Sequence, residues 1–282
     1  MSETLVAAVQ HALAHDPVLP RLRRTYRFSI GPHVTDEPQL NLVFSPSANF
    51  TLLKRHEFPG VTIHLVDRLS EYFIRDADRM LRLFRNIAER ELDKIVLVGS
   101  SKGGFAALMF GTLLSQYFPQ HSIEVRVFSP QVTLWPFNDV LPFPSYHRLI
   151  RGAEADTAIQ ANLIRFGDPT RRFSSVSNLK IKVAFGTGNQ ADQREADRLA
   201  PFDCVEMVPL DTSSHLSALP FIVDIRDRDQ IEETLLRYIT REKADADVAS
   251  LRLNKDIQKT VGEFVRLGSE KERLDSFWAG TA

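Results

Sequence analysis

The chain has 282 residues, 43% of them hydrophobic, and its 35 basic residues almost balance its 36 acidic ones, for a net charge of −1. This length allows one large domain or two small ones, and the hydrophobic share suffices for a sizeable core. A protein that binds nucleic acid or an anionic membrane normally has an excess of basic residues, so the balanced charge favours neither partner. It fits a neutral or small-molecule substrate better.

Cys204 is the only cysteine, which excludes an intrachain disulfide and favours a reducing compartment. The longest apolar stretch, residues 105–114, is too short to span a bilayer. The N-terminal residues form an amphipathic helical pattern rather than the pattern of a secretion signal. We therefore expect a cytoplasmic protein without a membrane span.

Short runs rich in β-branched and aromatic residues predict seven strands. They cover residues 25–30, 39–44, 61–66, 94–98, 123–128, 180–185 and 204–210. Helical spacing of apolar residues follows in segments 72–90, 105–117 and 190–200. Strands that alternate with helices favour crossover connections. The sequence therefore predicts an α/β fold with three layers, α/β/α, around a mostly parallel sheet.

Two regions interrupt this alternation. Residues 131–179 contain no convincing strand but hold several aromatics and a predicted helix at 156–165, which indicates a lid insertion. Among its aromatics, Trp135 and Phe137 are candidates for substrate contacts, although packing of the lid onto the core would explain them as well. Residues 241–282 form a helical tail after a main domain over residues 1–240, with an apolar face formed by Leu251, Leu253, Ile257, Val261, Phe264 and Val265. This face would suit packing on its own domain or a homo-oligomer contact.

The most informative motif lies in residues 94–108, where a buried strand runs into G-x-S-x-G and then into a helix of small residues. A sharp strand-to-helix turn holds its central residue, Ser101, in a strained conformation. The residues two before and two after it must therefore lack bulk, as Gly99 and Gly103 do. Ser101 would project at the positive end of a helix, where the backbone N–H of Lys102 can face an oxyanion.

This motif resembles the nucleophile elbow of the α/β-hydrolase superfamily of serine hydrolases. The resemblance implies an α/β-hydrolase-like main domain and a triad in the chain order serine, acid, histidine. His215 follows the last predicted strand, and Asp192 follows the strand before it. Asp211 and Asp168 are alternative acids, and the superfamily's acid often lies nearer the strand end, where this chain has Asn189.

In this interpretation His215 accepts the proton of Ser101, and Asp192 orients the imidazole and stabilises its charged form. The second oxyanion donor would come from the loop after strand 39–44, at Ser45 or Ser47, because Pro46 has no N–H. An ordinary turn rich in Ser, Pro and Asn is the alternative explanation of that loop.

The sequence thus predicts a serine hydrolase that cleaves an ester or related acyl bond, with a small-molecule or glycan-linked acyl substrate and without a metal or cofactor. An O-acyltransferase acting on a sugar hydroxyl is an alternative. The elbow and residues 128–131, Phe-Ser-Pro-Gln, are similar to bacterial relatives associated with glycan processing, including accessory-secretion acetyltransferases. A catalytically inactive binding module is the third hypothesis.

Two weaker patterns point elsewhere. Residues 186–191 match G-x-G-x-x-A, the dinucleotide-binding fingerprint, but too little chain follows them to complete a nucleotide-binding half. His11 and His15 have a spacing that can bind metal, yet no third ligand is evident and a solvated helix face explains them.

Overall fold

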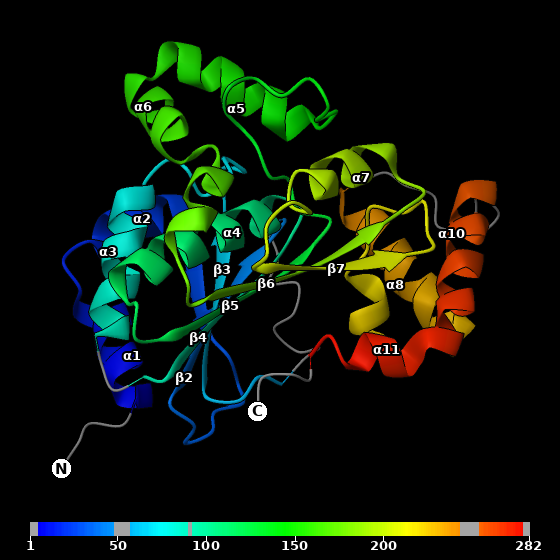
Figure 1. Ribbon diagram of the computed structural model, residues 1–282, viewed down its shortest axis with the longest axis horizontal. Helices are drawn as coiled ribbons and strands as arrows, with labels where there is room; N and C mark the ends of the chain where they lie inside the picture. Colours follow the sequence, from blue (N-terminus) through cyan, green and yellow to red (C-terminus); the bar gives the residue numbers. More distant parts are fainter. Residues whose placement is uncertain (1–4, 48–56, 90–91, 243–253, 279–282) are drawn as a thin grey trace.

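The computed structural model describes residues 5–47, 57–89, 92–242 and 254–278 (Figure 1). Its centre is a seven-stranded sheet in the order β1-β3-β2-β4-β5-β6-β7. The strands are β1 (Tyr26–Ile30), β2 (Gln39–Ser45), β3 (Val61–Asp67), β4 (Lys94–Ser100), β5 (Ser122–Phe128), β6 (Leu179–Gly186) and β7 (Val205–Leu210). All neighbours are parallel except β1, which runs antiparallel to β3. The prediction of a mostly parallel sheet is confirmed.

Helices connect these strands and extend beyond them. They are α1 (Leu5–His15), α2 (Leu19–Thr25), α3 (Ala77–Ala88), α4 (Lys102–Tyr117), α5 (Pro144–Ala155), α6 (Thr157–Phe166), α7 (Gln190–Asp197), α8 (Arg228–Glu242), α10 (Lys255–Arg266) and α11 (Lys271–Asp275). Short 3₁₀ turns occur at Pro169–Ser175, Leu219–Phe221 and Leu267–Glu270. Within the described ranges, no helix combines the length and apolar character needed to cross a bilayer.

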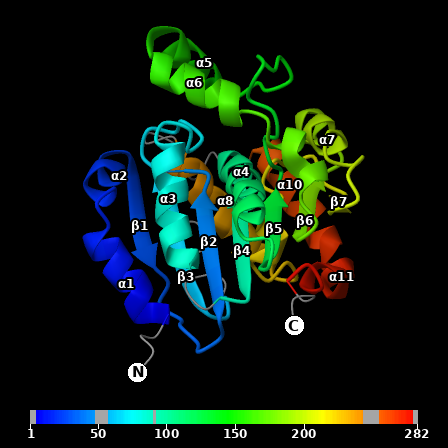
Figure 2. The same cartoon turned by 60° about the vertical axis from the view of Figure 1, so that its left-hand side comes forward.

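Alternation along the strands produces two cores, one on each face of the sheet. In β2, Leu42 and Phe44 join a cluster with helices α1 to α7, whereas Val43 joins a second cluster with α8, α10 and α11. Leu97 and Val98 of β4 divide in the same way. Successive side chains of a strand point to opposite faces, so each central strand supplies both cores. The helices lie on the two sides of the sheet (Figure 2), and the three-layer α/β/α prediction is confirmed.

The tail packs on its own domain through the apolar face that the sequence indicates. Ile257, Val261 and Phe264 of α10 are buried in the second core. Leu251 and Leu253 lie outside the described residues. The helix α10 packs against α8, which the sequence pattern did not predict. The described part of the apolar face is therefore covered by the same chain.

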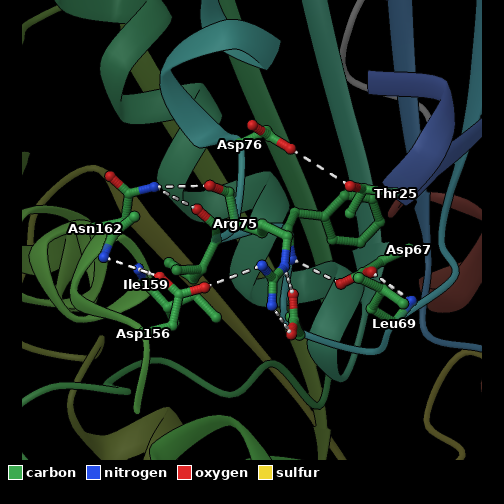
Figure 3. A network of polar contacts seen from close by, with 12 residues as sticks. Thr25, Asp67, Leu69, Arg75, Asp76, Asp156, Ile159 and Asn162 are labelled. Atoms are coloured by element: carbon green, nitrogen blue, oxygen red, sulfur yellow. Dashed lines mark hydrogen bonds and ion pairs between the residues drawn. The ribbon is translucent and has the colours of Figure 1, made fainter. Parts of the chain in front are cut away.

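The insertion between β5 and β6 contains two α-helices, α5 and α6, where the sequence predicts one. Both lie beyond the carboxyl ends of the strands (Figure 2). Arg75 binds the Asp156 carboxylate at 3.1 Å, and the Asn162 amide donates to the carbonyls of Ile74 and Arg75 at 2.9 and 3.0 Å (Figure 3). These contacts attach α6 to the turn that precedes α3, so the insertion is fixed to the main domain.

Candidate active site

Ser101 lies on a sharp turn between β4 and α4. Its φ of 53° and ψ of −118° lie in a region that side chains rarely adopt, and such strain costs about 1–3 kcal/mol. A Cβ added to Gly99 would lie 2.0 Å from the Gly103 carbonyl oxygen, and one on Gly103 would lie 2.1 Å from that of Phe44. Both positions therefore require glycine, and the second contact places the end of β2 beside the first turn of α4.

Ser101, His215 and Asp192 form a continuous chain of hydrogen bonds. His215 Nε2 lies 2.9 Å from Ser101 Oγ, and His215 Nδ1 lies 2.7 Å from Asp192 Oδ1. When Nδ1 carries the ring proton, it donates a hydrogen bond to the carboxylate. Nε2 then accepts a hydrogen bond from the serine hydroxyl. Three residues separated widely in the sequence thus meet at the carboxyl ends of three different strands.

The Asp192 carboxylate is buried, and both of its oxygens are used. Oδ2 accepts a hydrogen bond from Ser129 Oγ at 2.7 Å, and Ser129 Oγ lies 2.8 Å from Ser217 Oγ. Asn189, at the position where the superfamily often has its acid, is the N-cap of α7 and accepts from the backbone N–H groups of Ala191 and Asp192. The cap fixes the helix start, and Asp192 lies in its first turn.

The two loops that carry Asp192 and His215 pack closely on each other. A Cβ on Gly186 would lie 2.7 Å from the Thr212 carbonyl oxygen, and one on Gly188 would lie 3.1 Å from Ser213 Cα. The Gly188 N–H donates to the Thr212 carbonyl at 3.0 Å. Close approach of the two loops explains the glycines of the G-x-G-x-x-A pattern without a nucleotide.

Glu263 of the tail helix α10 holds the loop that carries His215. Its buried carboxylate accepts hydrogen bonds from the Thr212 hydroxyl at 2.8 Å, the Ser213 N–H at 2.8 Å and the Ser213 hydroxyl at 2.9 Å. Burial by itself raises the pKa of Glu263, but these hydrogen bonds and Lys259 lower it, and the pKa lies below its usual value. The carboxylate is therefore charged at neutral pH.

A second buried carboxylate, Glu195, fixes the start of the insertion. Its Oε2 accepts from the N–H groups of Val132 and Thr133 at 2.6 and 3.2 Å, and its Oε1 accepts from the Asn138 amide at 2.8 Å. Glu195 lies one helical turn after Asp192, so α7 supports both the candidate acid and the segment that begins at Gln131.

Gln131 itself contacts the candidate nucleophile, since its Nε2 lies 2.9 Å from Ser101 Oγ. Sequence patterns alone indicated no role for Gln131, Ser129, Glu195 or Glu263. Two sequence signals could have found Ser129 and Gln131: their position directly after the predicted strand 123–128, and their place in the Phe-Ser-Pro-Gln stretch that is similar to glycan-associated relatives. Glu195 and Glu263 contact backbone groups far away in the chain, and no spacing rule reveals such contacts.

The other candidate residues occupy different places around this centre. Lys102 is the first residue of α4, Ser45 is the buried last residue of β2, and Ser47 follows it. Trp135 is half-buried against the first core, and Phe137 is exposed and stacks on Tyr146. Another aromatic ring of the insertion contacts the histidine directly: the centroid of Phe143 lies 4.9 Å from that of His215.

The rings of His11 and His15 lie 4.7 Å apart on α1. Across the described ranges, no group of three or more His, Cys, Asp or Glu side chains is arranged to hold a metal ion. The histidine pair thus has no third ligand in that part of the chain.

A mostly parallel sheet between two helical layers, with a serine turn after a central strand, is the architecture of the α/β-hydrolase fold. No family model matches the chain, and no curated protein matches it. Similar solved structures include esterases, lipases and serine hydrolases of this fold.

Three of these structures show which kinds of enzyme are similar and how low the sequence identity is. Esterase B from Lactobacillus rhamnosis is 12% identical, with 73% of this chain and 84% of that chain covered and a TM-score of 0.40. A fluorophosphonate-binding serine hydrolase from Staphylococcus aureus is 13% identical, with 64% and 83% covered and a TM-score of 0.41. A monoacylglycerol lipase from Paleococcus ferrophilus is 10% identical, with 66% and 88% covered and a TM-score of 0.41. At such identities the activity of a neighbour does not transfer to this chain.

Proposed function

We propose that the protein is a serine hydrolase that cleaves a carboxylic ester or a related acyl bond through an acyl-enzyme on Ser101. The observation that carries this proposal is the hydrogen-bonded chain from Ser101 Oγ through His215 to Asp192, with distances of 2.9 and 2.7 Å. A serine hydroxyl is a poor nucleophile at neutral pH and needs a base within bonding distance. The strained turn that presents this hydroxyl has a conformational cost that an ordinary βα connection would avoid.

In the first half-reaction, His215 Nε2 takes the proton of Ser101 as Oγ attacks the carbonyl carbon of the substrate. The bond to the leaving group breaks, and His215 gives the proton to the leaving oxygen. Asp192 holds the imidazole in the required tautomer and stabilises the imidazolium, because its charge lies against Nδ1. The acyl group is then bound to Ser101.

In the second half-reaction, water loses a proton to His215 and attacks the acyl carbon, and the free acid leaves as the proton returns to Ser101. The backbone N–H of Lys102 is the first candidate for the oxyanion donor, because Lys102 directly follows Ser101 and begins α4. Ser45 or Ser47 would supply the second donor, because the end of β2 lies against the first turn of α4.

The insertion would contact the acyl or alcohol part of the substrate. Phe143 lies against His215, and Trp135 and Phe137 belong to the same segment. Apolar rings beside a catalytic group favour an apolar or ring-shaped substrate part over a strongly charged one. A small-molecule or glycan-linked ester fits this description.

The proposal is tested with a fluorophosphonate probe, which reacts with an activated serine. We expect the folded protein to be labelled on the peptide that contains Ser101, and Ser101→Ala to abolish the labelling. Ser100→Ala is the matched control, because it removes the neighbouring hydroxyl at the end of β4 and should leave labelling intact. A folded wild-type protein that does not react would overturn the proposal and favour a non-catalytic binding module.

A second experiment distinguishes hydrolysis from transfer of the acyl group. Free acid released from a chromogenic acyl ester is measured with and without sugar acceptors. Hydrolysis predicts the same release in both cases. A fall in acid release with the appearance of an acylated sugar would instead identify an O-acyltransferase.

A further inference from the structure

The hydroxyl of Ser101 has two polar neighbours rather than one. His215 Nε2 and Gln131 Nε2 each lie 2.9 Å from Ser101 Oγ. Gln131 is 1% exposed, and its backbone is held in place by its neighbours, because Val132 and Thr133 donate to the buried Glu195 carboxylate. The amide side chain is thus fixed against the nucleophile.

The other end of this amide is unsatisfied. Gln131 Oε1 is buried and has no hydrogen-bond partner among the described residues. Burying a polar atom without a partner is destabilising, whereas an apolar side chain of similar length would fill the same space without that cost. An uncompensated amide in contact with the candidate nucleophile indicates a use for its N–H group.

We propose that Gln131 is a further catalytic residue, whose side-chain N–H binds Ser101 Oγ and stabilises the negative charge that develops on this oxygen in both half-reactions. The inference rests on the proposed function, since it concerns the same serine. A hydroxyl oxygen has two lone pairs. With Gln131 bound to one of them and the hydroxyl proton directed to His215, the second lone pair is the one left to attack the carbonyl carbon.

The bond changes are those of the proposed reaction, and Gln131 neither gains nor loses a proton. In acylation, the Oγ–H proton goes to His215 while the new C–Oγ bond forms. In deacylation, the C–Oγ bond breaks and Oγ carries the negative charge until His215 returns the proton. The Gln131 N–H is directed at Oγ in both steps, and a hydrogen bond to a charged oxygen is stronger than one to a neutral oxygen.

The test compares Gln131→Met with the wild-type protein. Methionine fills a similar volume without donating a hydrogen bond and without burying an unsatisfied oxygen. We expect it to keep or raise the melting temperature while it slows fluorophosphonate labelling of Ser101 by about 10- to 100-fold, the range for a hydrogen bond to a charged group. Gln131→Glu should also slow labelling, because a carboxylate repels the developing charge.

Gln39→Ala is the matched control. Gln39 is also a buried glutamine, but it lies at the start of β2, away from Ser101, and donates a hydrogen bond to Asn41. It should change stability without changing the labelling rate of the folded protein. Labelling of Gln131→Met within twofold of the wild-type rate would overturn the proposed role of Gln131 and leave the proposed hydrolase function standing. Absence of labelling in the wild-type protein would overturn the proposed function, so the two failures are distinguishable.

Discussion

Ser213 donates two hydrogen bonds to the Glu263 carboxylate, one from its backbone N–H at 2.8 Å and one from its hydroxyl at 2.9 Å. His215 follows Ser213 by two residues, so a helix of the tail fixes the loop that carries the candidate base. The tail is thus joined to the site by hydrogen bonds in addition to its apolar packing on the second core.

Glu263→Ala should lower the free energy of unfolding by about 1–3 kcal/mol, since it leaves the buried Thr212 hydroxyl and the partly buried donors of Ser213 without an acceptor. It should also slow fluorophosphonate labelling of Ser101, because His215 loses its support. Urea unfolding and labelling kinetics measure the two effects. Lys259→Met is the control: it removes only an ion pair whose lysine is exposed, and should change stability by less than about 1 kcal/mol. Wild-type labelling kinetics in folded Glu263→Ala would contradict this prediction.

Asp192→Asn should reduce the labelling rate by about 10³- to 10⁴-fold with little change in folding, because an amide favours the wrong imidazole tautomer and cannot stabilise the imidazolium. The matched control is Asp211→Asn, the other acid close to His215 in the sequence, and it should label at the wild-type rate. Full labelling of Asp192→Asn together with slow labelling of Asp211→Asn would transfer the role of the acid to Asp211.

Ser129→Ala removes the hydroxyl that donates to Asp192 Oδ2 at 2.7 Å. We expect labelling of Ser101 to slow by about 3- to 10-fold, the effect of one ordinary hydrogen bond. Ser217→Ala deletes a hydroxyl that contacts Ser129 and the Ala184 carbonyl but not Asp192, so its effect should be smaller. An equal or larger effect of Ser217→Ala would contradict this order.

Burial lowers the pKa of His64 from 6.5 to about 4. Below pH 6.5 the unfolded chain binds a proton at this site that the folded protein does not, so acid favours unfolding. The free energy of unfolding should therefore fall by about 3 kcal/mol between pH 6.5 and 4 on account of His64, and be independent of this residue above pH 7.5.

Urea unfolding of the wild-type protein and His64→Gln over this pH range measures the contribution, because glutamine does not titrate. As the pH falls, His64→Gln should lose less stability than the wild-type protein. A pH-independent difference for His64→Gln would exclude this cause.

Local patterns predicted much of the fold. The run of residues 94–98 and the small residues after it place a strand, a turn and a helix around Ser101, because only a strand followed by a helix satisfies that pattern of apolar and glycine residues. The antiparallel direction of β1 was not predictable in this way, because strand direction depends on the pairing partner and not on composition. The helix α5 escaped prediction because its apolar side is narrow, with only Tyr146, Leu149 and Ala153 buried.

The sequence by itself determined the alternation of strands and helices, the serine turn, and His215 and Asp192 as the candidates for its partners. Only the tertiary structure decided that Asp192 contacts His215, that Gln131 reaches Ser101, and that Glu263 supports the histidine loop. The physical reason is range. Backbone propensity and side-chain periodicity act over a few residues, whereas these hydrogen bonds join atoms that only the packed sheet and its helices bring within 3 Å.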